Sequence, residues 1–288
     1  EPGTLKLLRS EAEKNQALAM ADMLAAQGLQ YEVLDRAKLL AREPMLAQAR
    51  DGLVGALYAP DDRVGNARLF CKALLKAALA KGGRARFDTQ VAQLQMSNGR
   101  VSGVLLADGE VLEGDVLLCA GAYSAKLAAQ AGIALPIRPA KGYSLTLDAQ
   151  TVSAPLTHPL VDPQSHIAVT PLGDKLRILG MAEFAGFDTQ VEAKRLGLLR
   201  GFFEQLLPET ASELDWQTAK GWAGLRPMAA DGRPFIGQSK RDGLWLNCGH
   251  GHLGWTMAVG SARLLADIYE GRTPEIDGAA FAPIKRSV

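Results

Sequence analysis

The sequence predicts an α+β fold, in which a mixed and largely antiparallel sheet accompanies a second region built on buried strands. Helix and strand patterns alternate through residues 4–81, and short strands separated by turns fill residues 135–185. No internal repeat and no low-complexity linker divides the chain. These observations favour an antiparallel region that is inserted into a region carrying buried strands.

The amino-terminal elements follow from capping and stop signals. Residues 4–8 are largely apolar and predict a strand. Residues 11–27 predict a helix, because a capping box opens the segment and Gly28 closes it. Residues 31–34 predict a short strand and residues 36–42 a short helix.

The next elements form one helix and a hairpin. Residues 66–81 show the apolar period of an amphipathic helix. Residues 90–97 and 100–107 flank an Asn-Gly pair, which favours a tight hairpin turn because both residues tolerate positive φ. Residues 115–119 predict a strand buried on both faces, because they are continuously apolar after Asp115. The remaining expected elements are a strand at 110–113, a helix to residue 130, strands at 142–147, 166–170 and 176–180, a helix at 188–207, a strand at 244–248 and a helix at 256–270.

Composition narrows the class of protein. The 288 residues are 48% hydrophobic and 22% charged, which is typical of a globular protein, and the net charge of +1 gives no basis for nucleic-acid binding. No apolar run approaches the ~20 residues that span a bilayer. Cys71, Cys119 and Cys248 are far apart, so we expect reduced core residues of a cytoplasmic protein, in preference to a metal site or a disulfide.

The most distinctive motif is GHGHLG at residues 249–254, between a predicted strand and a predicted helix. It has the G-x-G-x-x-G spacing of a dinucleotide turn, but the second strand and its ribose-binding acidic residue do not follow. A helix N-terminus that faces another anion or oxygen therefore fits better than an NAD site. A zinc site at His250 and His252 would need a third ligand, so we interpret both as loop histidines and assign no metal.

Two side chains are open to more than one interpretation. Arg226 lies among apolar residues, where it either forms a structural ion pair or binds an anionic ligand, and the residues alone favour the ion pair. Tyr143 either packs in the core or donates a hydrogen bond in a pocket. The sequence contains no G-x-S-x-G, P-loop or C-x-x-C motif, so hydrolase, NTPase and thiol-redox functions lack support.

Several motifs together resemble one family. They are YAPDD at 58–62, AGAYS at 120–124, KGYSL at 141–145, GMAE at 180–183 with GF at 186–187, WAGLRPM at 222–228, DGRPFIG at 231–237 and LWLNCGHGHLGWT at 244–256. In this order they resemble the flavin-dependent D-amino-acid dehydrogenases, which group with glycine and sarcosine oxidases. The resemblance covers nearly the whole chain.

The resemblance implies a domain division. Residues 1–51 and 135–225 would form the substrate-binding domain, residues 52–134 and 226–275 the remainder of an FAD-binding domain, and residues 276–288 a tail. Such enzymes open with a βαβ unit that holds the FAD pyrophosphate, and this sequence does not match that unit. The implied fold is therefore α+β with an incomplete FAD-binding domain, and we expect the chain to bind FAD weakly or not at all.

The resemblance also implies site residues. Val91 would face the adenine through its backbone, and Ala120 and Gly121 would approach the diphosphate. Arg226 would bind the substrate carboxylate, which reverses the interpretation above, and Tyr143 is a weaker candidate for the same pocket. The residues that would lie along the flavin ring are Gly249, His250, Gly251, His252, Leu253, Gly254, Trp255 and Thr256. A direct role for the His252 imidazole is not expected, and no acid–base residue is assigned.

The implied reaction, assigned to a complete parent enzyme of which this chain would be a fragment, is oxidative deamination of a D-amino acid by hydride transfer to FAD. It needs orientation of the substrate more than an acid–base pair. Electrons would pass to the respiratory chain, so the location is cytoplasmic, with peripheral attachment to the inner membrane left open. Two alternatives remain: an oxygen-using amine oxidase of the glycine or sarcosine type, and a catalytically silent truncated substrate-domain scaffold.

Overall fold

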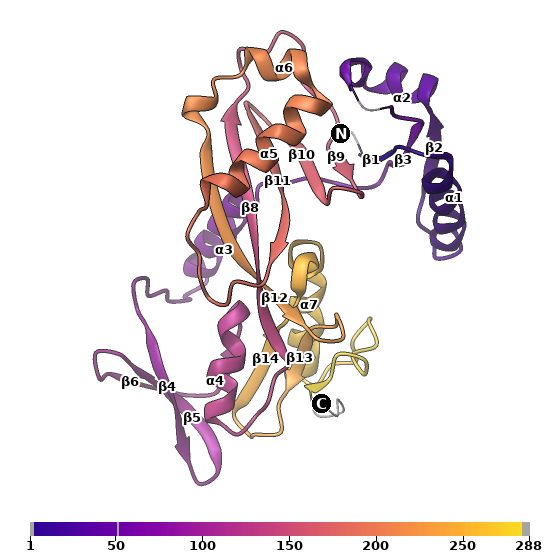
Figure 1. The fold of residues 1–288 in the computed structure, drawn as a ribbon. Coiled ribbons are helices and arrows are strands. Elements are labelled where there is room, and N and C mark those ends of the chain that lie inside the picture. The colour runs from indigo at the N-terminus through magenta and orange to yellow at the C-terminus, as the bar shows by residue number, and fades with distance from the viewer. Residues whose placement is uncertain (1–2, 51, 284–288) are drawn as a thin grey trace. The chain divides into compact units, whose positions relative to one another are not determined.

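A computed structural model describes residues 3–50 and 52–283 (Figure 1). Helices and strands alternate along the chain, with long strands in its middle. The helices are α1 (Glu11–Ala25), α2 (Arg36–Arg42), η1 (Pro44–Gln48), α3 (Ala67–Ala80), η2 (Gly121–Tyr123), α4 (Ser124–Gln130), α5 (Ala193–Leu206), α6 (Pro208–Glu213), η3 (Trp216–Thr218), η4 (Gly251–Leu253) and α7 (Gly254–Tyr269). The strands are β1 (Thr4–Leu8), β2 (Glu32–Asp35), β3 (Gly55–Ala59), β4 (Val91–Ser97), β5 (Arg100–Leu106), β6 (Val111–Glu113), β7 (Val116–Leu118), β8 (Ile137–Asp148), β9 (Leu160–Asp162), β10 (Ile167–Leu172), β11 (Lys175–Glu183), β12 (Lys220–Ala229), β13 (Phe235–Gln238) and β14 (Leu244–Cys248).

The chain divides into two compact units. Unit 1 contains Glu1–Phe70, Gly142–Ala182 and Thr189–Gly224. Unit 2 contains Cys71–Lys141, Glu183–Asp188 and Leu225–Val288. The predicted domains have different boundaries from these units. The prediction also assigns a ligand to each domain, whereas the compact units carry no information on ligands. The division into substrate-binding and FAD-binding domains therefore stays a prediction.

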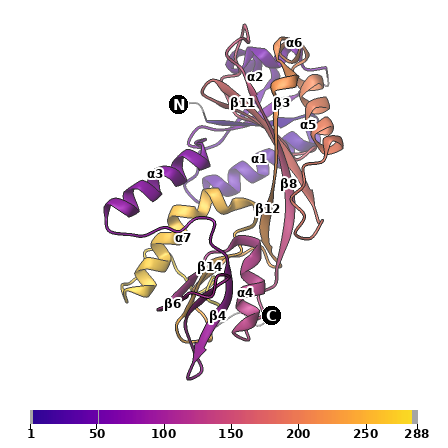
Figure 2. The same cartoon turned by 90° about the vertical axis from the view of Figure 1, so that its left-hand side faces the viewer.

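Unit 1 holds most of an eight-stranded sheet in the order β12-β8-β11-β10-β9-β1-β3-β2, and residues 137–141 of β8 and 225–229 of β12 belong to unit 2. The pairs β10–β11 and β1–β3 are antiparallel, whereas β1 and β9 are parallel. Helix α5 packs on this sheet, and its Leu199 and Phe203 are fully buried in the same cluster as Leu145 and Ile178 (Figure 2). The mixed, mainly antiparallel sheet confirms the predicted α+β class.

Unit 2 contains two three-stranded sheets, β13-β14-β7 and β4-β5-β6. In the first sheet β14 is antiparallel to β13 and parallel to β7. Alternate side chains of β14 face opposite sides. Leu244 and Leu246 pack in one cluster with Ala128 of α4, and Trp245 packs in another with Leu264 of α7. A helix therefore covers each face of the sheet.

Most element predictions are confirmed. The hairpin β4–β5 forms around Asn98 and Gly99, whose φ angles are 49° and 79°. Helix α1 ends at Ala25, and the Ser10 side chain accepts a hydrogen bond from the Glu13 amide, as the capping box requires. The helix expected from residue 188 is wrong at its start, because the chain stays irregular until Ala193.

Two burial predictions are wrong. Leu117 is half-exposed in the short strand β7, and Cys119 after it is exposed, so this segment is not buried on both faces. Cys71 is exposed as well, and it lies in α3, a helix in which no residue is buried. Only Cys248, among the three cysteines, is a core residue.

Candidate cofactor and substrate site

Two neighbouring parallel strands of unit 2 end at the same edge of their sheet. Strands β7 and β14 pair in register, with Leu118 opposite Leu246. Each strand leads into a glycine turn, a 3₁₀ turn and a helix: Gly121 precedes α4, and Gly249 precedes α7. In sheets of this kind ligands bind beyond the carboxyl ends of parallel strands. The structure therefore brings two of the sequence-predicted cofactor segments to one edge.

The turn before α7 depends on two glycines. Gly249 has φ of 81°, and a Cβ atom there would lie 3.3 Å from side-chain atoms of Ile137 and Phe235. Gly251 has φ of 58°, and its Cβ would lie 3.4 Å from the Met228 sulfur. Both backbones thus adopt conformations and approaches that larger residues resist. The turn is a closely packed feature of unit 2.

The first turn of α7 offers donors to a ligand. Its N-cap residue Leu253 makes no side-chain capping hydrogen bond. Backbone amides at a helix N-terminus that lack such a cap bind anionic or electron-rich groups. Residues 254–256, which include Trp255 and Thr256, begin this turn, and their contact with the flavin ring stays a prediction.

His250 is fixed by a side chain of α7. Its Nε2 lies 3.1 Å from the Oγ of Ser261, which is seven residues, or about two helical turns, after the start of α7. Burial lowers the pKa of His250 below its ordinary value, so the ring is neutral near pH 7. His252 is exposed. The two histidines therefore differ, because His250 is half-buried and contacts Ser261, whereas His252 lies on the surface.

Arg226 is connected to this turn through β12. Met228 of that strand forms an antiparallel bridge with His250. Side chains at positions i and i+2 of a strand point to the same face, so Arg226 faces the side on which Met228 meets Gly251. Arg226 is half-buried, and desolvation lowers the pKa of its guanidinium. A partly desolvated guanidinium fork suits a carboxylate ligand.

The turn after β7 has a different character. Gly121 has φ of 54°, and within residues 3–50 and 52–283 no atom apart from its chain neighbours lies within 4 Å of where its Cβ would stand. Ala120 is its half-buried neighbour, and Ser124 at the start of α4 is fully buried. The Ser124 Oγ has no hydrogen-bond partner among the residues that the structure describes. The space beside Gly121 would allow a ligand to approach the protein backbone closely.

Two further predicted residues lie elsewhere. Val91 begins β4 and pairs with Leu106 in the other sheet of unit 2. Tyr143 is 2% exposed and lies in the hydrophobic core of unit 1. Their assigned contacts, with adenine and with substrate, stay predictions.

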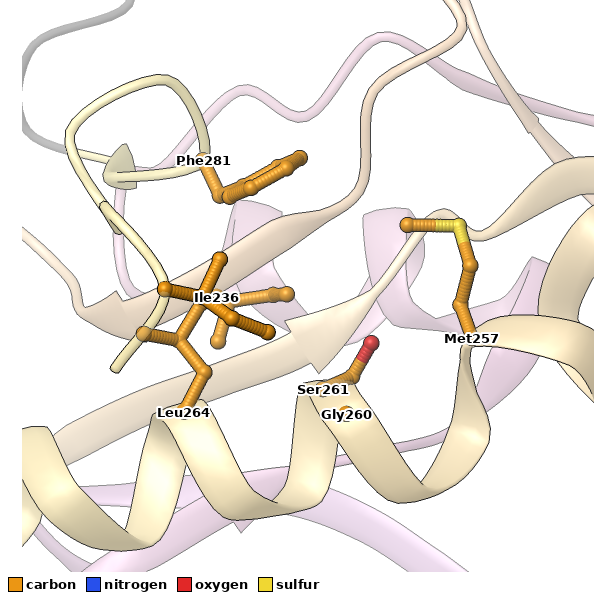
Figure 3. Close-up of a pocket in the computed structure, with 7 residues that line it drawn as sticks. Ile236, Met257, Gly260, Ser261, Leu264 and Phe281 are labelled. Atoms are coloured by element: carbon orange, nitrogen blue, oxygen red, sulfur yellow. The ribbon is translucent and has the colours of Figure 1, made fainter. Parts of the chain in front are cut away.

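An apolar pocket of about 150 Å³ lies beside the same helix (Figure 3). Ile236, Met257, Leu264 and Phe281 line it, and Ser261 contributes the one hydroxyl. Because the Ser261 Oγ also meets His250, the pocket and the glycine turn share a side chain. Sequence reasoning did not single out Ser261, and its place seven residues after the turn is the only signal that could have found it.

Comparison with known proteins decides the family. The model of a family described as FAD dependent oxidoreductase matches residues 1–268. The chain belongs to this family. It is 42% identical over 277 residues to a D-amino acid dehydrogenase from Methylobacterium nodulans, and 40% identical over 278 residues to one from Xanthobacter autotrophicus. Each alignment covers 96% of this chain and 65% of the relative, so the chain spans somewhat less than two thirds of their length.

Solved structures share the fold. Glycine oxidase from Geobacillus kaustophilus matches with a TM-score of 0.89 at 24% identity, over all of this chain and 76% of that one. Iminodiacetate oxidase from Chelativorans sp. BNC1 matches with a TM-score of 0.85 at 23% identity, over 98% of this chain and 75% of that one. These identities are low, so the two structures support the fold of the FAD-dependent oxidoreductases without deciding the substrate.

Proposed function

We propose that this protein oxidises D-amino acids, with FAD as the hydride acceptor. The curated relatives with about 40% identity are D-amino acid dehydrogenases. The observation that carries the proposal is the bridge between Met228 and His250, because it joins the strand of Arg226 to the glycine turn before α7. A carboxylate-binding side chain and a helix N-terminus then serve one site in unit 2.

The residues have distinct tasks in this proposal. The Arg226 guanidinium binds the substrate carboxylate and so fixes the orientation of the Cα–H bond. The amides at the start of α7 face the electron-rich edge of the cofactor ring, where negative charge develops. Bound FAD would accept the hydride from the substrate Cα.

The chemistry leaves little else to the protein. As the hydride leaves Cα, the amine nitrogen forms a double bond to that carbon and loses a proton to water. Water then adds to the imino acid and releases ammonia, which leaves a keto acid. The neutral His250 adds no positive charge to the site, so the field there comes from Arg226 and the helix amides.

The electron acceptor of the second half-reaction belongs to the proposal too. We expect an acceptor of the respiratory chain in place of oxygen, in line with the relatives' description as dehydrogenases. No helix in the described part of the chain is both long and apolar enough to cross a bilayer.

The test is turnover of the protein with excess FAD, D-alanine and an artificial electron-accepting dye. The expected result is dye reduction that requires FAD and D-alanine and does not occur with L-alanine. Peroxide release without dye would replace the proposal by an oxygen-using oxidase. Absence of turnover with every D-amino acid while FAD is bound would overturn it, and failure to bind FAD at millimolar concentration would favour the silent scaffold.

A further inference from the structure

A short segment joins two parts of unit 2 that are remote in sequence. Glu183–Asp188 belongs to unit 2, although the residues before and after it belong to unit 1. Its last two residues, Phe187 and Asp188, contact side chains from other parts of unit 2. The chain therefore enters unit 2 for six residues, makes specific contacts and returns.

The first contact is an ion pair with a buried lysine. The Lys141 Nζ lies 2.8 Å from the Asp188 Oδ2. The Lys141 side chain is fully buried, whereas Asp188 is 43% exposed. A buried ammonium group needs such a partner, because burial without compensation is costly. Asp188 thus fixes the position of Lys141, the first residue of the KGYSL segment at 141–145.

The second contact is made by the neighbouring aromatic ring. Phe187 lies against Tyr123, with 4.9 Å between ring centroids and 35° between planes. The Lys126 Nζ stands 3.7 Å from the centroid of the Phe187 ring, within cation–π distance. Tyr123 ends the turn that starts at Gly121, and Lys126 lies in the helix after it. Phe187 thus holds the turn after β7.

We propose that residues 183–188 form a strap that positions the turn after β7 relative to Lys141. The positioning residues are Phe187, Asp188 and Lys141. The strap contacts the turn after β7 through Tyr123 and the following helix through Lys126. The inference deepens the proposed function, on which it rests, because Ala120 and Gly121 of the same turn are the predicted diphosphate contacts. A loosened strap would lower cofactor affinity without removing a cofactor contact.

The strap differs from an ordinary surface loop in one measurable way. Its two contacts are adjacent in sequence but hold segments that are separate in the chain. Release of one contact should therefore loosen the other segment as well. A loop with two independent local contacts would show no such transmission.

The experiment compares Phe187→Ala with Phe184→Ala, because Phe184 lies in the same segment and is 78% exposed. Hydrogen–deuterium exchange of the full chain is followed in peptides covering residues 119–127 and 137–143. Phe187→Ala is expected to speed exchange in both peptides, and Phe184→Ala in neither. Faster exchange only in the first peptide, or equal effects of both variants, would overturn the strap.

A second pair of variants tests the ion pair. Asp188→Asn is expected to speed exchange in both peptides, and Asp188→Glu to restore most of the protection, because the carboxylate is kept. In FAD titrations Phe187→Ala should raise the Kd roughly two- to fivefold, the range that a lost cation–π contact predicts. If the unaltered protein does not bind FAD, the proposed function fails, while the exchange data still decide on the strap.

Discussion

The two glycine turns of unit 2 have the same order of elements and different supports. Both follow parallel neighbouring strands, and both lead through a 3₁₀ turn into a helix. The turn at Gly249 is packed against core side chains, whereas the position beside Gly121 is open. Helix α7 has 16 residues and α4 has 7, so only α7 is long enough for an appreciable dipole at its start.

In the proposed function the two turns would have different tasks at one sheet edge. The turn before α7 would supply charge stabilisation, and Met228 connects it to the strand of Arg226. The turn before α4 supplies room for close approach and is held from outside by Phe187. The same order of elements thus produces one turn that is packed against apolar side chains and one turn with open space beside its glycine.

The largest expected effect is on the free energy of unfolding when the glycine of each turn is replaced by alanine. Gly249→Ala should lower the free energy of unfolding by about 2–4 kcal/mol, because left-handed strain adds to overpacking against Ile137 and Phe235. Gly121→Ala is the matched variant, with strain and no packing conflict, and should cost about 1–2 kcal/mol. Urea unfolding measures both values. Equal costs would show that the two turns are packed alike.

The next effect tests the connection of the packed turn to the substrate. Arg226→Met should lower kcat/KM for D-alanine roughly ten- to hundredfold, because a hydrogen bond to a charged group is worth about 1.5–3 kcal/mol. Arg233→Met is the control, since Arg233 is 51% exposed and pairs with Asp231. Steady-state kinetics with dye decide the point. An unchanged kcat/KM in Arg226→Met would remove this arginine from the site.

A smaller effect contrasts two buried serines. Ser261→Ala should cost about 1 kcal/mol of unfolding free energy, because the His250 Nε2 loses its partner. Ser124→Ala should be neutral or slightly stabilising, since its buried Oγ has no partner in residues 3–50 or 52–283. Thermal and urea unfolding report the two signs. A loss of stability in Ser124→Ala equal to that in Ser261→Ala would contradict the contrast.

The smallest effect is a pH dependence from His250. Burial lowers the pKa of this ring in the folded protein, so the unfolded chain binds more protons between the folded pKa and the unfolded value of about 6.5. Stability should therefore fall as the pH drops below about 6.5, and His250→Asn should reduce that slope. His252→Asn is the control for an exposed histidine. If the slope of stability against pH is unchanged in His250→Asn, other titrating groups cause the pH dependence.

Local sequence signals predicted local structure well. The Asn98-Gly99 turn, the capping box at Ser10 and the strand–glycine–helix order around Gly249 are encoded within a few residues, and the structure contains all three. The glycine turn before α7 could thus be located from the sequence, and the edge that it shares with the Gly121 turn follows from the pairing of β7 with β14.

The remaining features depend on partners that are distant in the chain. The exposure of Cys119 follows from the place of β7 at the edge of its sheet, which apolar composition does not encode. The pair of Lys141 with Asp188 joins residues 47 positions apart, and no local pattern marks it. The roles of Val91 and Tyr143 come from family likeness alone, so no physical argument from burial or spacing could have supplied them.

The parallel pairing of β7 with β14 also sets an order of assembly. The two strands are separated in the chain by residues 119–243, which include most of the eight-stranded sheet. Contacts across such long separations form slowly, because the loop between them must first be closed. During synthesis the edge with both glycine turns cannot exist before residue 251 has left the ribosome. A ligand that needs both turns could therefore bind this edge only after the long segment between the two strands has been made.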